Sequence, residues 1–243
     1  MIVVLPEDGE LMIRLSWGPR EESLEEVARK LRSTAGLARL LGGLFDHDLA
    51  LLDGERVCGY LDSLSDDDLV AYLRLHVATN SDGSPLPQDG YFAHLESAPG
   101  QLASAMLTIH VGATRTQFST GNSLSLSVSQ DFSPDHLDTG LFMSNRRDAV
   151  LRELVSLWRP RRAGVYLAEA LDAYITLDLV EELGLVTYLA ECSVASTPEY
   201  QVEHAGNDSW IHVLNVGVPS GLNARVERLV DASRKLSQSH ADR

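Results

Sequence analysis

Two short acidic segments carry side chains that could bind a divalent metal ion. Asp46-His47-Asp48 and Asp135-His136-Leu137-Asp138 each combine imidazole with carboxylate groups, and both groups are suitable ligands for such ions. Neither segment has further ligands at a spacing that is typical of a metal site. A small metal-assisted hydrolase using Asp46, His47, Asp48 or His136 therefore remains an alternative, but we expect no metal.

Other catalytic signatures are missing from the sequence. It contains no G-x-x-x-x-G-K-S/T phosphate loop, no G-x-S-x-G turn and no H-E-x-x-H helix motif. Serine and histidine residues could supply a nucleophilic site, but geometry defines such a site. His110 and His212 fall within strand patterns, where core or sheet-face positions explain them better. We therefore expect a protein that is not an enzyme and needs no cofactor.

The chain carries a large acidic excess. It has 35 acidic and 20 basic residues, which gives a formal net charge of −15 at pH 7. Such a field repels the phosphates of nucleic acids, so we expect no direct nucleic acid binding. Six arginines form a basic stripe against this trend, and an adaptor docking an acidic partner there is a second alternative. They are Arg146, Arg147, Arg152, Arg159, Arg161 and Arg162.

Hydropathy and cysteine content indicate a cytoplasmic protein. No apolar run approaches the roughly 20 residues that cross a bilayer. Residues 1–5 lack the basic start of a secretory signal. Cys58 and Cys192 have no metal-binding spacing, and we expect both to be buried thiols.

The N-terminal part predicts a strand followed by a capped helix. Alternation over 10–16 places the indole of Trp17 on the apolar face of the strand. Gly18-Pro19 then ends the strand. Ser23 and Glu26 form a capping-box pair, and apolar residues follow at helical spacing. We therefore expect Trp17 to pack beneath this helix.

The remaining patterns predict mixed elements. We expect an irregular stretch through Asp46, Asp48 and Asp53, and a loop over 80–90 that is a weak possible boundary within a single domain, 1–243. Strands grouped between helices favour an α+β fold with antiparallel sheet elements. Helices are predicted over 66–76, with Ser65 as the N-cap, over 146–158, which Pro160 ends, and over part of 165–184 and 221–237. Strands are predicted over 103–113, 122–130, 186–194, 200–204 and 210–216.

Two motifs and a third, shorter segment resemble those of a known family. The segment from Leu15 to Glu26, LSWGPREESLEE, resembles the opening motif of the immunity protein 52 family. The segment 184–189 resembles that family's glycine-aromatic-threonine-tyrosine strand, and 223–226 also fits. Val27 stands where cysteine is frequent in the family, and Leu185 replaces the usual aromatic residue. The middle of the chain matches only in layout.

The resemblance implies a function. Similar proteins are encoded beside polymorphic toxins, often ones with a restriction-endonuclease-like nuclease domain, and protect the producing cell by binding the toxin. We therefore expect a non-enzymatic immunity protein that binds and neutralises a cognate nuclease toxin of a type VI or related secretion system. The family-motif residues Trp17, Gly18, Arg20 and Tyr188 are expected to be structural.

Acidic side chains are the candidates for toxin binding. A nuclease presents cationic groups to the phosphate backbone, so an acidic protein can compete for that surface and associate rapidly. The candidates lie in expected loops and at a helix start. They are Asp46, Asp48, Asp53, Glu55, Asp66, Asp67 and Asp68.

Overall fold

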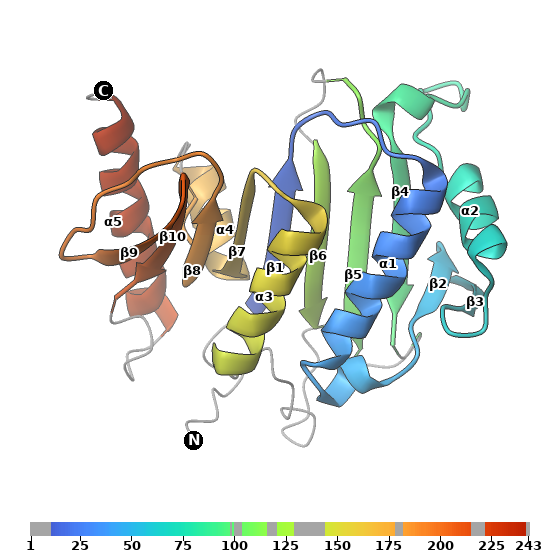
Figure 1. Cartoon of the computed structure of the whole chain (residues 1–243), viewed down its shortest axis with the longest axis horizontal. Helices are drawn as coiled ribbons and strands as arrows, with labels where there is room; N and C mark the ends of the chain where they lie inside the picture. The colour runs from blue at the N-terminus through green and yellow to red at the C-terminus, as the bar shows by residue number, and fades with distance from the viewer. Residues whose placement is uncertain are drawn as a thin grey trace. The chain divides into compact units, whose positions relative to one another are not determined.

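The computed structural model describes residues 11–97, 99, 104–115, 121–128, 144–177, 182–214 and 222–241. Helices and antiparallel strands are mixed along these ranges, which confirms the predicted α+β class (Figure 1). The segment 135–138, one of the two possible metal-binding segments, lies outside the described residues. None of the helices in the described ranges combines the length and the apolar composition that a membrane span requires.

The chain divides into two compact units. The central unit contains residues 15–160, and the terminal unit contains residues 1–14 and 161–243. The first border falls inside strand β1 (Leu11–Trp17), and the second follows helix α3 (Ser144–Trp158). The predicted boundary loop at 80–90 lies within the central unit.

The central unit is built on an antiparallel sheet. Its strands follow the order β3–β2–β4–β5–β6, and β1 adjoins β6. Inward-facing residues of β5 and β6, such as Leu107 and Leu126, are fully buried and lie opposite each other. The strands are β2 (Ala50–Asp53), β3 (Arg56–Tyr60), β4 (Tyr91–Glu96), β5 (Ala105–Val111) and β6 (Asn122–Val128).

Helices α1 (Leu24–Arg39) and α3 run side by side over one face of this sheet (Figure 1). The Ser23 hydroxyl caps α1 by accepting from the Glu26 N–H, so half of the predicted capping box is formed, while the Glu26 carboxylate pairs with Lys30. A complete capping box begins α2 (Asp66–Leu75). Short 3₁₀ turns lie at η2 (Gly43–Asp46) and η3 (Pro87–Asp89).

The segment between β1 and α1 is fixed by the neighbouring strands. Trp17 is only 6% exposed, so its predicted burial is confirmed. The Asn122 amide donates to the Gly18 carbonyl, and the Arg20 N–H donates to the Ala113 carbonyl. These bonds hold the Trp17–Arg20 motif over the ends of β5 and β6.

Three strands of the central unit were missed from the sequence. The stretch expected to be irregular contains β2, in which Ala50, Leu51 and Leu52 are all buried. A strand buried on both faces shows no alternation, so its pattern resembles any short apolar run. Strands β3 and β4 were not predicted either. Cys58 is exposed on β3 and Cys192 is half-buried, so the prediction of two buried thiols is wrong.

The terminal unit has its own strands and helices. Strand β7 (Arg162–Leu167) pairs with β8 (Val186–Leu189), which pairs with β10 (Asp208–Val213) and then β9 (Tyr200–Ala205). Helices α4 (Ala168–Thr176) and α5 (Leu222–Ala241) contact each other. The helix expected within 165–184 is α4, which begins at Ala168 because residues 165–167 belong to β7.

The second family motif has a packing role in this unit. A Cβ atom at Gly184 would lie 2.1 Å from the Val165 carbonyl oxygen, so only glycine fits beside β7. The Tyr188 hydroxyl donates to Asp208 Oδ2 at 2.8 Å. Burial, followed by the Asp208 carboxylate, raises the pKa of Tyr188 to about 12. These contacts agree with the structural role expected for the motif.

Candidate functional site

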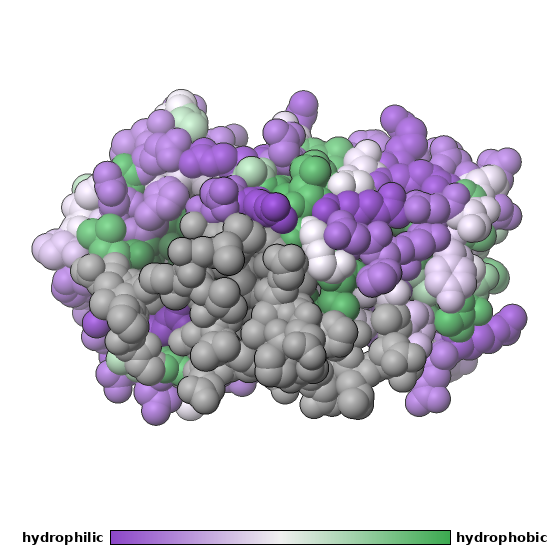
Figure 2. Space-filling model, turned by 90° about the horizontal axis from the view of Figure 1, so that it is seen from below, coloured by the Kyte–Doolittle hydropathy of each residue, from purple (hydrophilic) through white to green (hydrophobic). Residues whose placement is uncertain are grey.

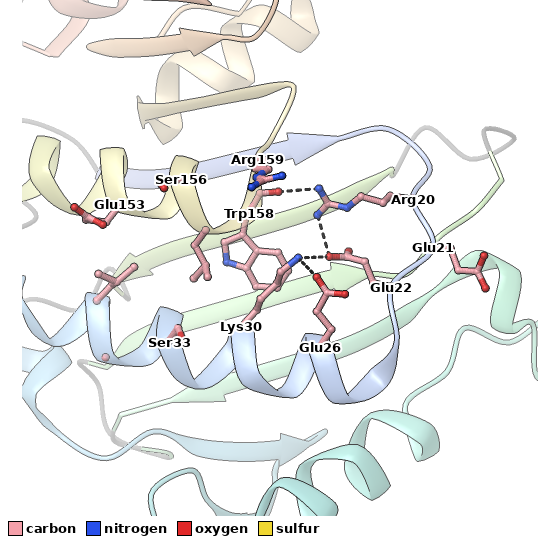
Figure 3. A pocket seen from close by; sticks show the side chains of 13 residues that line it. Arg20, Glu21, Glu22, Glu26, Lys30, Ser33, Glu153, Ser156, Trp158 and Arg159 are labelled. Carbon is pink, nitrogen blue, oxygen red and sulfur yellow. Dashed lines mark hydrogen bonds and ion pairs between the residues drawn. The ribbon is translucent and has the colours of Figure 1, made fainter. Parts of the chain in front are cut away.

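A groove lies between α1 and α3 in the central unit, and Figure 3 shows the side chains that line it. Its volume is about 800 Å³, within the range of small-molecule and side-chain pockets. Glu26, Lys30 and Ser33 project into it from α1. Glu153 and Ser156 of α3, with the following Arg159, form the facing wall.

An ion network closes one end of the groove. Glu22 Oε1 accepts from Arg20 Nη2 at 3.0 Å and from Lys30 Nζ at 2.7 Å. Lys30 also lies 2.8 Å from Glu26 Oε1, and this hydrogen bond lowers the pKa of Glu26. The Glu22 side chain is only 2% exposed. A carboxylate so buried is stable only when cations or donors surround it.

Two indole rings pack against the cations of this network. The Trp17 and Trp158 ring centroids lie 5.2 Å apart. The Arg20 guanidinium lies 5.2 Å from the Trp17 centroid, and Lys30 Nζ lies 5.3 Å from that of Trp158, which are cation–π distances. Arg20 Nη1 donates to the Trp158 carbonyl at 2.9 Å, and Trp158 Nε1 donates to Thr34 Oγ1 at 2.8 Å. Arg20 thus joins the family motif to the end of α3.

Three buried polar atoms in and beside the groove have no hydrogen-bond partner among the described residues. They are Glu22 Oε2, Arg20 Nε and Trp17 Nε1. Leaving such an atom unpaired costs about 1–3 kcal/mol. The carboxylate oxygen needs a donor, and Arg20 Nε needs an acceptor.

The structure uses three of the acidic candidates locally. Asp48 Oδ1 accepts from the Asp62 N–H and lies 3.9 Å from Arg39. Asp66 pairs with Arg32 of α1 at 2.7 Å. Asp68 belongs to the capping box of α2, whose hydrogen bonds lower its pKa. Asp48 and Asp66 thus pair with arginines of α1, whereas Asp68 stabilises the start of its own helix.

The other acidic candidates are exposed, and they do not form one cluster. Asp46, Glu55 and Asp67 make no ion pair with any described residue. Asp53 lies 3.6 Å from His76. Asp53 and Glu55 flank the β2–β3 turn, whereas Asp46 precedes β2 at the opposite end of the hairpin.

The described residues provide no metal centre. No group of three or more histidine, cysteine, aspartate or glutamate side chains is placed to hold a metal ion there. Asp46-His47-Asp48 therefore lacks the additional ligands that a metal site requires. The hydrolase alternative has no supporting observation within these ranges.

The six arginines do not form one exposed stripe. Arg147 is 7% exposed and lies 3.2 Å from Asp148. Arg146 and Arg152 are exposed on α3, whereas Arg161 and Arg162 belong to the terminal unit. The burial of Arg147 removes one of the six arginines from the surface that the adaptor alternative requires.

A hydroxyl–imidazole–carboxylate chain lies on the central sheet. His94 Nδ1 is 2.9 Å from Thr108 Oγ1, and His94 Nε2 is 3.0 Å from Glu96 Oε1. The order of groups is that of a nucleophilic triad, but such catalysis also needs free donors for an oxyanion. Here Thr108 and His94 face each other within a paired β4–β5 ladder, which engages the nearby backbone N–H groups. We interpret the chain as a sheet-surface network.

The surface in Figure 2 is mainly hydrophilic where its residues are described, and apolar side chains appear in small separate groups. A broad apolar docking face is therefore not visible from this side among the described residues.

No protein-family model matches the chain, and no curated protein matches it either. The functional argument therefore depends on the contacts of these residues and on the two motifs that resemble the immunity protein 52 family.

Proposed function

We propose that this protein is a non-enzymatic immunity protein, which acts in the cytoplasm by binding and neutralising a cognate nuclease toxin of a type VI or related secretion system. The main support for this proposal is the acidic surface. The net charge is −15, and Asp46, Glu55 and Asp67 are exposed without an ion pair among the described residues. The resemblance of 15–26 and 184–189 to the immunity protein 52 family supports the same function.

The physical basis is competition for a cationic surface. A nuclease binds its substrate through lysine and arginine contacts to phosphates. Unpaired carboxylates on an inhibitor attract the same groups, accelerate encounter and favour this partner over neutral surfaces. A stable one-to-one complex would bury about 1,600 Å² in total.

Co-expression with the toxin gene from the adjacent locus tests the proposal. Cells that carry both genes should survive, whereas cells with the toxin alone should die. The proposal is wrong if this protein makes no difference to survival.

A matched pair of variants then tests the acidic surface. The triple variant Asp46→Asn, Glu55→Gln and Asp67→Asn should bind the toxin more slowly. The control variant Asp172→Asn, Glu191→Gln and Glu227→Gln also removes three exposed carboxylates, all in the terminal unit, and should leave the association rate unchanged. Equal slowing by both variants would show only a response to net charge.

A further inference from the structure

The groove between α1 and α3 contains a buried acceptor that the protein does not satisfy. Glu22 Oε1 already binds Arg20 and Lys30, while Oε2 has no partner among the described residues. Figure 3 shows four side chains that converge at one end of the groove, those of Arg20, Glu22, Glu26 and Lys30. A small rotation of the carboxylate would present the second oxygen to a donor in the groove.

A second carboxylate lies beside the first. Lys30 Nζ contacts Glu22 at 2.7 Å and Glu26 at 2.8 Å, so both carboxylates share this one ammonium group. The Glu26 side chain is 44% exposed. A planar guanidinium can donate to two carboxylates at once, because its N–H groups form a rigid fork.

The charge of the groove favours a cation. Four of its lining residues are acidic, Glu21, Glu22, Glu26 and Glu153, and three are basic, Arg20, Lys30 and Arg159. The lining therefore has one negative charge in excess when all seven groups are ionised. An incoming cation would balance that charge and supply the donor that Glu22 lacks.

The wall of the groove also leaves room for close approach. Gly36 lies in the interior of α1, and a Cβ atom placed there would meet no atom within 4 Å. Glycine is a poor helix former, so alanine would be more stable at such a position. Ser33 and Ser156 are the neighbouring small residues of the lining. The open space is suited to the aliphatic stem of a long side chain.

We propose that this groove receives an arginine side chain of the toxin, whose guanidinium lies against the carboxylates of Glu22 and Glu26 while its stem runs along the groove toward Ser33. The inference depends on the proposed function for the identity of the partner. The exposed carboxylates would attract the toxin over a distance, whereas this arginine would form a specific buried contact. A few such buried contacts commonly dominate the binding energy of an interface.

The test uses the full chain and a catalytically inactive form of the adjacent toxin's nuclease domain, with affinity measured by calorimetry. Glu22→Gln should weaken binding at least about thirtyfold, the low end for truncating a buried charge partner. Ser33→Leu fills the groove beside the proposed stem without altering the ion network and should weaken binding about tenfold or more. Ala71→Leu adds the same side chain at an exposed position on α2 and should have no effect.

The toxin's own arginines identify the ligand. An arginine-to-alanine scan of the toxin should find one substitution that weakens binding to the unsubstituted protein. The same substitution should have little further effect on binding to the Glu22→Gln variant. Equal binding by the unsubstituted protein and Ser33→Leu would overturn the groove while leaving the proposed function intact. Absence of any toxin binding by the unsubstituted protein would refute the proposed function, and this inference with it.

Discussion

The hydrogen bond between Trp158 and Thr34 should contribute a measurable coupling energy. Both residues are fully buried, and Trp158 Nε1 donates to Thr34 Oγ1 at 2.8 Å. The same hydroxyl donates to the Lys30 carbonyl at 2.8 Å. Thr34→Val nearly preserves the shape of the side chain but removes the acceptor for the indole. Trp158→Phe removes the indole donor itself.

The expected energies follow from what each change leaves unpaired. Thr34→Val leaves a buried indole N–H without a partner, which should lower the free energy of unfolding by about 1–3 kcal/mol. Trp158→Phe loses the hydrogen bond and ring area, which should cost about 2–4 kcal/mol. The double variant has no stranded N–H group. Its loss should therefore be smaller than the sum of the single losses by about 1 kcal/mol.

Urea unfolding followed by far-ultraviolet circular dichroism measures these energies, because fluorescence would itself change with Trp158. The control cycle combines Thr34→Val with Trp210→Phe in the terminal unit, and it should be additive within about 0.5 kcal/mol. If the Thr34–Trp158 cycle is equally additive, the hydrogen bond contributes no coupling and our account of how Trp158 is held is wrong.

Three further outcomes are expected. Gly36→Ala should raise the free energy of unfolding by about 0.5–1 kcal/mol in thermal melts, since the added Cβ has open space; a lower melting temperature would contradict this. The lowered pKa of Asp68 stabilises the fold fully above the ordinary value of 3.8, and this stability is lost as pH falls through the lowered pKa. Asp68→Asn should therefore make urea midpoints less sensitive to acid, and unchanged sensitivity would refute the assignment. The slower toxin association of the Asp46, Glu55 and Asp67 triple variant should approach that of the unsubstituted protein near 1 M salt, where charges are screened within about 3 Å; a salt-independent difference would exclude steering.

Local signals predicted the helices of the central unit well. Ser23 and Ser65 each marked a helix start because their hydroxyls cap backbone N–H groups that have no other partner. Pro160 likewise marked the end of α3, which stops at Trp158. These signals lie within a few residues of the boundary that they specify, so they can be read without knowing the fold.

Strands without alternation were harder to predict. Strand β2 is buried along Ala50, Leu51 and Leu52, while β3 is exposed from Arg56 to Cys58. Neither shows a period of two, because their environments are set by strand pairing and covering helices. The Gly54 turn that joins them has a positive φ of 61°, and the preceding Asp53 could have identified a hairpin.

The groove could not be predicted from local pattern. The sequence places charged residues at successive intervals of four, at Glu22, Glu26 and Lys30. This spacing is typical of any solvent-exposed helix face. Only the packing of α3 beside this face buries Glu22 and creates a cavity. The sequence-based prediction therefore named exposed acidic residues as toxin-binding candidates and did not include the buried Glu22.

The contacts that close the groove have a consequence for biosynthesis. Arg20 and Trp158 are 138 positions apart, and Thr34 and Trp158 are 124 apart. Contacts at such separation form slowly, because a long loop must be ordered before they contribute. While Trp158 is still inside the ribosome, the chain can already expose the β2–β3 hairpin with Asp53 and Glu55. It still lacks α3, which forms the second wall of the groove. We therefore expect that newly made chains become competent for anchored toxin binding only after α3 has been synthesised and has docked.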